Sequence, residues 1–328
     1  MVFKTGSLVR VYFYLVAGHL FAGFAIVWFF TDVPLEIYRN FWHEVLLAPL
    51  SLLLDGSWAF LGIIVFGLIF ARDLLRERLP LAFVVGILAG IQHLVFTLIK
   101  TTMVNISPFY ADPFLIEVDE LLSFGRTPWE LTHQFQAYIP EALTTFIYLK
   151  VWLAIGVIFP VILLVVDSNK ERVGRFLILY FASWVVLGNV IALVFMSCGP
   201  IFFDRVYGGN DFAPLLEALN TSGTMGGAVG FIQEYLWENY VEGNQHLGTG
   251  ISAFPSVHIG VATMFALYIY ERFPKTLPIC IAFVLTYLFL SVFLGWHYVV
   301  DGYVSILFIV LLWKFLLWQS RKTGEVVV

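Results

Sequence analysis

The sequence has few charged residues and few cysteines. Only 12% of its 328 residues are Asp, Glu, Lys or Arg, whereas 60% are hydrophobic and 18% are aromatic. A water-soluble globular domain carries about twice that charged fraction, so a soluble fold is excluded. The two cysteines, Cys198 and Cys280, stand outside any CxxC pattern and cannot form a disulfide framework. A net charge of -5 argues against nucleic acid as a partner. The composition therefore indicates an integral membrane protein.

Apolar residues gather in runs of the length that an α-helix needs to cross a bilayer, roughly 20 residues. No soluble domain, internal repeat or low-complexity segment separates these runs, and the first lacks a small-residue cleavage site, which favours a retained span. We predict an all-α integral membrane protein with about eight transmembrane helices in a single membrane domain, residues 1–328. The run at residues 57–71 is short, and the residues before it also fit an interfacial or re-entrant piece. The predicted spans are residues 8–30, 57–71, 80–100, 141–166, 174–196, 256–271, 277–295 and 299–318.

Positively charged residues are distributed unevenly between the two sides of these spans. Lysine and arginine are retained on the cytoplasmic side of a membrane when the loops are shorter than about 60 residues. With the N-terminus inside, 13 of the 18 Lys and Arg residues fall on the cytoplasmic side, and Lys150 falls within a span. The four on the opposite side are Arg39, Lys100, Arg126 and Arg205. This asymmetry predicts that both termini are cytoplasmic.

Two long loops then face the periplasm, the lumen or the exterior. They divide the domain into accessory spans (1–100), an outer interfacial loop (101–140) and catalytic core spans (141–318) that include the second outer loop (197–255). The stretches "DPFLIEVDELLSFG" and "AVGFIQEYLWENYVEG" have apolar residues every three to four positions, as expected for short helices at a membrane interface. We expect these helices to form a lid or platform over the outer face.

Two polar motifs lie at the outer ends of predicted spans. The first, "GTGISAFPSVHIGVA", contains His258, and the second, "FLGWHYVVDGY", contains His297 and Asp301. The latter two residues are four positions apart, which on a helix places them one turn apart on one face. An aspartate that accepts from one imidazole nitrogen leaves the other nitrogen free as a base or nucleophile. The topology therefore predicts that the two histidines and the carboxylate converge on one membrane surface.

The backbone before His258 predicts an anion site. Pro255 suits the first turn of a helix, where its missing N–H costs nothing, and the free N–H groups of residues 256–258 would then bind an anion. Ser256 either contacts that anion or caps the helix. An anion between a nucleophile and a second histidine is the arrangement that phosphoryl transfer needs, with His297 attacking phosphorus and His258 protonating the departing oxygen.

These residues resemble the type 2 phosphatidic acid phosphatase superfamily of integral membrane lipid phosphatases and phosphotransferases. The longer form "GISAFPSVHIGVA" with "GWHYVVDG" is most similar to the inositol phosphorylceramide synthase (inositolphosphotransferase) branch and its bacterial relatives, and "DELLSFGRTPWELTH" and "SCGPIFFDR" also fit that group. The similarity covers roughly residues 110–318. It implies a reaction without metal or cofactor, with a phosphohistidine on His297, Asp301 as its partner, His258 as general acid and Ser256 near the phosphate.

The sequence departs from the superfamily pattern in its basic residues. Other lipid phosphatases of the superfamily carry KxxxxxxRP before the first histidine motif and an arginine six positions ahead of the nucleophile. Here the KxxxxxxRP pattern is absent, and the position six residues ahead of His297 is occupied by Ser291 instead of an arginine. We expect Arg205 to bind the phosphate, with Lys150 as a further candidate and Arg126 as a third. The missing arginines favour the transferase branch.

Three functions remain open from the sequence. The first is transfer of a phosphoryl or phospho-head-group from a lipid phosphate to an alcohol, in inositol- or ceramide-type chemistry, or to water. Its partners would be the lipid phosphate, a polyol such as inositol and the surrounding membrane lipids. The second is a metal-dependent hydrolase in which His258, His297 and Asp301 ligate Zn²⁺ or Fe²⁺. The third is a non-catalytic transporter or scaffold. The protein is expected in the cell membrane or an endomembrane, with its site on the non-cytoplasmic side.

Overall fold

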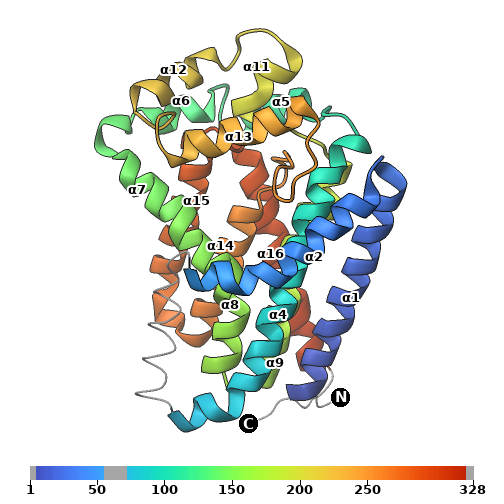
Figure 1. Ribbon diagram of the computed structural model, residues 1–328. Helices are drawn as coiled ribbons and strands as arrows, with labels where there is room; N and C mark the ends of the chain where they lie inside the picture. The colour runs from blue at the N-terminus through green and yellow to red at the C-terminus, as the bar shows by residue number, and fades with distance from the viewer. Residues whose placement is uncertain (1–4, 55–71, 323–328) are drawn as a thin grey trace.

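A computed structural model describes residues 5–54 and 72–322 of the chain, and all regular secondary structure in these ranges is helical. Figure 1 shows a bundle of long helices with the N- and C-terminal parts of the chain at one end and short helices over the other. We call these the terminal end and the capped end. The bundle consists of α1 (Thr5–Phe30), α4 (Arg72–Thr102), α8 (Trp152–Val166), α9 (Lys170–Ala182), α14 (Val257–Arg272), α15 (Leu277–Phe293) and α16 (Val299–Lys322), and α2 (Pro34–Leu54) crosses its side.

The cap is built from the two long loops that the sequence analysis predicts to lie on the outer side. Their stretches with helical periodicity do form helices, as predicted, and these lie across the bundle rather than along it (Figure 1). The cap helices are α5 (Asp112–Leu122), α6 (Pro128–His133), α11 (Pro200–Tyr207), α12 (Ala213–Thr221) and α13 (Ala228–Glu242).

The described residues contain six helical segments long and apolar enough to cross a membrane, and each corresponds to a predicted span. Of the two remaining predicted spans, residues 57–71 lie outside the described residues. The predicted span 256–271 corresponds to α14 (Val257–Arg272), which has only 16 residues and packs inside the bundle against α8, α15 and α16. The membrane-protein class is therefore confirmed, whereas eight crossings and their orientation stay a prediction.

Two spanning segments contain π-helical turns that the sequence did not predict. In the first, α7 (Glu141–Thr145) continues through η3 (Phe146–Val151) into α8, and in the second, α9 continues through η4 (Ser183–Ile191) into α10 (Ala192–Val194). A π turn inserts one residue into the helical repeat and reorients the side chains around it, and such turns are frequent at functional sites. Both π segments lie beside the cavity described below.

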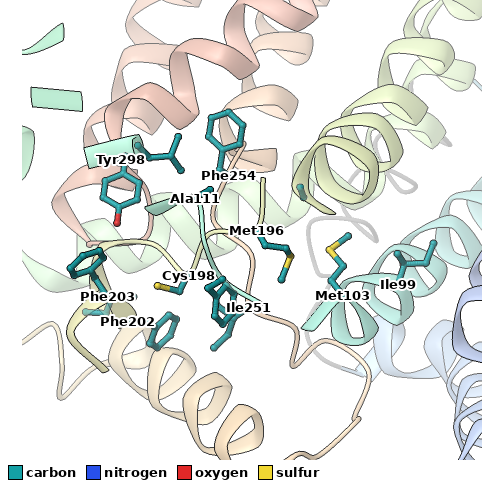
Figure 2. Packing of buried hydrophobic residues seen from close by; sticks show 14 of the residues in the cluster. Ile99, Met103, Ala111, Met196, Cys198, Phe202, Phe203, Ile251, Phe254 and Tyr298 are labelled. Carbon is teal, nitrogen blue, oxygen red and sulfur yellow. The ribbon is translucent and has the colours of Figure 1, made fainter. Parts of the chain in front are cut away.

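Buried apolar side chains fill the space beneath the cap. Figure 2 shows side chains from α4, from the segment before α11 and from the loop before α14 packed together. Met196, Cys198, Ile251, Phe254 and Tyr298 are each at most 6% exposed. The loop that leads to His258 and the turn that carries His297 therefore rest on one packed apolar layer.

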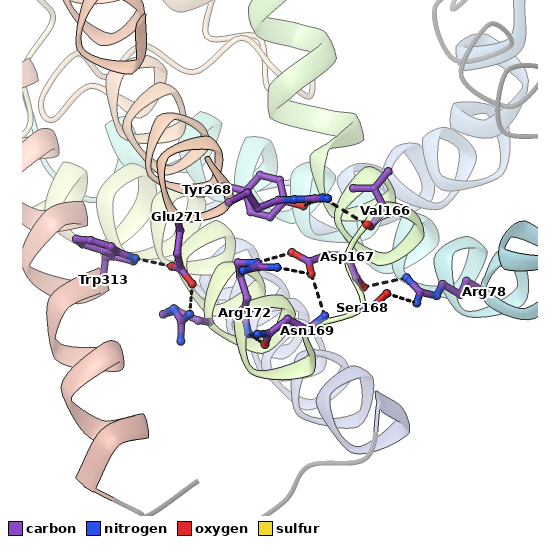
Figure 3. Close-up of polar contacts among 11 residues, drawn as sticks. Arg78, Val166, Asp167, Ser168, Asn169, Arg172, Tyr268, Glu271 and Trp313 are labelled. Atoms are coloured by element: carbon purple, nitrogen blue, oxygen red, sulfur yellow. Dashed lines mark hydrogen bonds and ion pairs between the residues drawn. The ribbon is translucent and has the colours of Figure 1, made fainter. Parts of the chain in front are cut away.

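A polar network holds the terminal end together (Figure 3). The Arg172 guanidinium donates to both oxygens of Asp167, at 2.6 and 2.9 Å, and Arg78 donates to the Asp167 carbonyl at 3.0 Å. Arg175 pairs with Glu271, which also accepts from the Trp313 indole. These contacts join α4, α8, α9, α14 and α16 at the end opposite to the predicted site.

Candidate active site

A cavity of about 220 Å³ lies between the bundle and the cap, and both His258 and His297 line it. Its walls come from α4, η3, η4, α14 and the turn before α16, and α13 covers it with Ile232 and Leu236. The loop before α14 contributes residues 250–253. Segments that are far apart in the sequence thus form one chamber, as the convergence of the two motifs predicted.

His297 and Asp301 are in contact, but only Asp301 lies on a helix. The helix α16 begins at Val299, as the predicted span 299–318 does, so His297 lies in the preceding turn. Asp301 lies in the first helical turn, where its Oδ2 accepts from the Tyr298 N–H at 3.2 Å, as a helix N-terminal capping residue does. The same oxygen lies 3.1 Å from His297 Nδ1. Asp301 is fully buried, and its other oxygen has no hydrogen-bond partner among the described residues.

The environment of His297 favours a neutral imidazole. Burial, together with the positive charge of Lys100, lowers the pKa of His297 to about 3, and the Ala253 carbonyl acts in the opposite direction. A histidine with this pKa is unprotonated at neutral pH and has a lone pair available on the nitrogen that does not face Asp301. This is the protonation state that a nucleophile requires.

His258 is held by two aromatic side chains. Its ring stacks on Tyr148 of η3, with centroids 4.4 Å apart, and on Trp152 of α8 at 4.0 Å. The Trp152 indole N–H also donates to the His258 carbonyl at 3.2 Å. The ring centroids of His258 and His297 are 6.2 Å apart. This separation is comparable to the sum of an attack distance of about 3–3.5 Å from a ring nitrogen to phosphorus and a hydrogen bond of about 3 Å to the leaving oxygen.

Ser256 caps α14, and this changes the predicted anion site. Ser256 is the N-cap residue, with its hydroxyl accepting from the Ile259 N–H at 3.4 Å, so Pro255 precedes the helix instead of occupying its first turn. The Ser256 N–H donates to the Asp301 carbonyl and is not free. Of the three predicted N–H donors, those of Val257 and His258 remain at the helix start, and both residues line the cavity.

Two aspartates of α5 position the turn that carries His297, and the sequence analysis missed both. Asp119 accepts from the Val300 N–H at 2.8 Å. Asp112 is fully buried and accepts from the Tyr298 hydroxyl at 3.1 Å. Asp112 also accepts from the Gly199 N–H at 2.9 Å. The two aspartates are seven positions apart in a helical stretch, so they share one face, and this spacing is the signal that could have revealed them.

The three basic residues proposed as phosphate ligands do not line the cavity. Both guanidinium nitrogens of Arg205 donate to Glu234, at 3.0 and 2.8 Å, and the group lies over the Trp237 ring. Lys150 and Arg126 are exposed. Their binding of phosphate stays a prediction that no contact supports, whereas Lys100, at the end of α4, does line the cavity. Its position at the outer end of a span was the available signal.

The metal-site alternative has no matching arrangement among residues 5–54 and 72–322. These ranges contain no group of three or more His, Cys, Asp or Glu side chains placed to hold a metal ion. In particular, Asp301 contacts His297 and the Tyr298 amide, and His258 is stacked between aromatic rings. The arrangement instead presents two imidazoles to one chamber, which suits a nucleophile and a general acid.

Comparison with known proteins gives one match. The model of the PAP2 superfamily matches residues 113–315, more than half of the chain. Neither the curated proteins nor the solved structures contain a match. The matched segment includes both histidine motifs and Asp119 of α5, whereas Asp112 lies one residue before its start.

Proposed function

Because the chain belongs to the PAP2 superfamily, we propose that it is a membrane lipid phosphatase or phosphotransferase with His297 as its nucleophile. Superfamily membership points to a phosphatase-type enzyme, and the six apolar helices place such an enzyme in a membrane. The observation that carries the proposal is the meeting of His258 and His297, from motifs about forty residues apart, with ring centroids 6.2 Å apart in one cavity.

In the first half-reaction, the free nitrogen of His297 attacks phosphorus. The P–N bond forms as the P–O bond to the leaving group breaks, and His258 donates its proton to the departing oxygen. Asp301, at 3.1 Å from Nδ1, stabilises the positive charge that develops on the His297 ring. The negative charge of the bound phosphate favours the protonated form of His258 that this step uses.

In the second half-reaction, an acceptor hydroxyl replaces His297 on phosphorus. His258, now unprotonated, takes the proton of the acceptor as its oxygen bonds to phosphorus, and the P–N bond breaks. Water as acceptor makes the protein a phosphatase, and an alcohol makes it a transferase. The absence of the superfamily arginines supports the alcohol, so we place the protein with the inositol phosphorylceramide synthase branch. The charge distribution along the chain supports a site on the non-cytoplasmic face.

Product analysis tests this function. Purified full-length protein is incubated with a panel of phospholipids and lipid pyrophosphates, with and without myo-inositol, and the products are identified by mass spectrometry. A transferase yields a phosphorylated alcohol or a new phosphodiester together with the free lipid alcohol. Release of inorganic phosphate alone would leave a phosphatase and remove the transferase assignment.

Two controls separate this function from the alternatives. We expect His297→Ala and His258→Ala to lower turnover by at least roughly 100-fold, because general acid–base help alone contributes about 10²- to 10⁴-fold. Turnover should survive EDTA. Loss in EDTA with recovery on adding Zn²⁺ would instead support the metal-dependent hydrolase, and full function in His297→Ala would support a transporter or scaffold.

A further inference from the structure

Lys100 places a positive charge in the cavity that contains the two histidines. Among the described residues that line the cavity, it is the one lysine or arginine, and none is an aspartate or glutamate. A chamber with one cation, two imidazoles and no carboxylate in its walls attracts an anion. Lys100 lies outside residues 113–315, so the family match says nothing about it.

The Lys100 ammonium has no ion-pair partner in the described parts of the chain. No carboxylate of residues 9–47 or 78–322 lies within ion-pair distance of it, and its Nζ lies 5.8 Å from the centroid of the Phe96 ring. An unpaired charge in apolar surroundings costs free energy, which a bound anion would offset. An ionisable residue in a span is for this reason a candidate for function.

The end of α4 is fixed against the loop that leads to His258. A Cβ on Gly250 would lie 2.4 Å from the Lys100 carbonyl carbon and oxygen, so the two backbones touch at a position where only glycine fits. The Thr101 hydroxyl also donates to the His246 carbonyl at 3.2 Å. These contacts hold Lys100 and the His258 loop in one fixed arrangement. Lys100 is therefore placed by packing rather than by a flexible loop.

We propose that the Lys100 ammonium binds a non-bridging oxygen of the substrate phosphate and takes the place of the basic residues that this chain lacks. The inference rests on the proposed function and assigns its phosphate-binding residue. The N–H groups of Val257 and His258 bind from the start of α14, and Lys100 neutralises charge as the phosphorus becomes five-coordinate. In the free enzyme the same positive charge helps to keep His297 unprotonated, as the lowered pKa of His297 indicates.

Binding of inorganic phosphate to the full-length protein in detergent micelles tests the proposal without turnover. We expect Lys100→Gln to weaken phosphate binding roughly 10- to 100-fold, since one hydrogen bond to a charged group contributes about 1.5–3 kcal/mol and each 1.4 kcal/mol is tenfold. Lys100→Arg should retain most of the affinity. Lys275→Gln removes the charge of an exposed lysine in the connection before α15 and should leave phosphate affinity unchanged.

A second measurement uses the unaltered protein, so it does not depend on the folding of a variant. Amine modification followed by mass spectrometry should show that inorganic phosphate protects Lys100 and leaves Lys275 unprotected. Equal affinity in Lys100→Gln and wild type, no phosphate binding by the wild type, or no protection of Lys100 would each overturn the proposal. His297→Ala should still bind phosphate. If the phosphate results hold while no phospholipid is turned over, the proposed function fails and the anion site stands.

Discussion

The turn that carries His297 is fixed by partners on both sides of the residue. The His297 N–H donates to the Ser291 carbonyl at 3.3 Å, and its side chain contacts Asp301. Tyr298 and Val300, which follow it, donate to the two α5 aspartates. A nucleophile is effective only when it is held near the attacking geometry, so each of these contacts contributes to the chemistry through position. Asp119 allows the cleanest test, because it also titrates.

Substitutions of Asp119 separate position from charge. Asp119→Ala removes the acceptor of the buried Val300 N–H, which should lower the free energy of unfolding by about 1–3 kcal/mol. The displaced turn should lower kcat more than it raises KM, because His297 is misplaced for attack while the cavity is retained. Asp119→Asn keeps an oxygen in this place and should restore both. A shift in KM alone in Asp119→Ala would show that Asp119 does not position the nucleophile.

The pH dependence of stability tests the raised pKa of the Asp119 carboxyl group. Burial, with the charges of Asp301 and Glu120, raises the pKa of Asp119 from 3.8 to about 7, and hydrogen bonds from the Val299 and Val300 amides oppose this shift. Between about pH 4 and 7 the folded protein keeps a proton that the unfolded chain releases, so stability is lost as pH rises through this window. Melting curves from pH 5 to 8 should show a steeper fall of Tm in wild type than in Asp119→Asn. Parallel slopes would contradict the raised pKa.

At the residue scale, the sequence identifies site residues that lie within the two motifs. It misses site residues that tertiary packing brings to the cavity from other parts of the chain. His258, His297 and Asp301 were identified from spacing, and the structure brings them to one cavity wall or into contact. The sequence put Lys100 at the outer end of a span but did not single it out, because its place in the cavity depends on how α4 meets the loop at Gly250. Arg205 was chosen for its closeness in sequence, but a carboxylate on α13 satisfies its guanidinium.

At the scale of helices, hydrophobicity predicts that a spanning helix exists, but it does not predict the exact residue at which the helix begins or the π-helical turns within it. Six predicted spans are helices of spanning length, because burial in lipid requires both an apolar surface and satisfied backbone hydrogen bonds. The π segments η3 and η4 were not predicted, since a one-residue change in helical repeat leaves the hydrophobicity unchanged. The start of α14 was predicted two residues early, at Pro255, because proline suits both the first helical turn and the extended residues before it.

The close approach of the His258 loop to the α4 backbone at Gly250 predicts that a larger side chain there disturbs the cavity. Gly250→Ala forces the loop away from the α4 backbone, because its Cβ would lie 2.4 Å from Lys100 carbonyl atoms. We expect turnover and inorganic-phosphate affinity both to fall by roughly tenfold or more, as a 1 Å misplacement can cost about 10²-fold in rate. Gly90→Ala on the same helix is the matched control, since a Cβ there has no neighbour within 4 Å. Wild-type rate and affinity in Gly250→Ala would show that this approach does not position Lys100.

At the scale of the whole molecule, the terminal end and the capped end of the bundle have different structural roles. The terminal end joins helices through buried ion pairs such as Arg175 with Glu271, whereas the capped end holds the cavity under short helices (Figures 1 and 3). The start of α1 and the end of α16 lie at the end away from the cavity (Figure 1). The charge asymmetry of the sequence predicts that this terminal end is cytoplasmic, so the cavity should open on the non-cytoplasmic side.

Labelling of single cysteines in sealed cells tests this orientation. Arg126→Cys, on the capped side, should react with a membrane-impermeant maleimide added outside, and Lys275→Cys, at the terminal end, should react only after permeabilisation. The native Cys198 and Cys280 are buried, and burial together with the charge of Asp112 raises the pKa of the Cys198 thiol, which keeps it in its unreactive protonated form. The unsubstituted protein therefore gives a low background. Labelling of Lys275→Cys in intact cells would invert the topology and place the proposed phosphate chemistry at the cytoplasmic face.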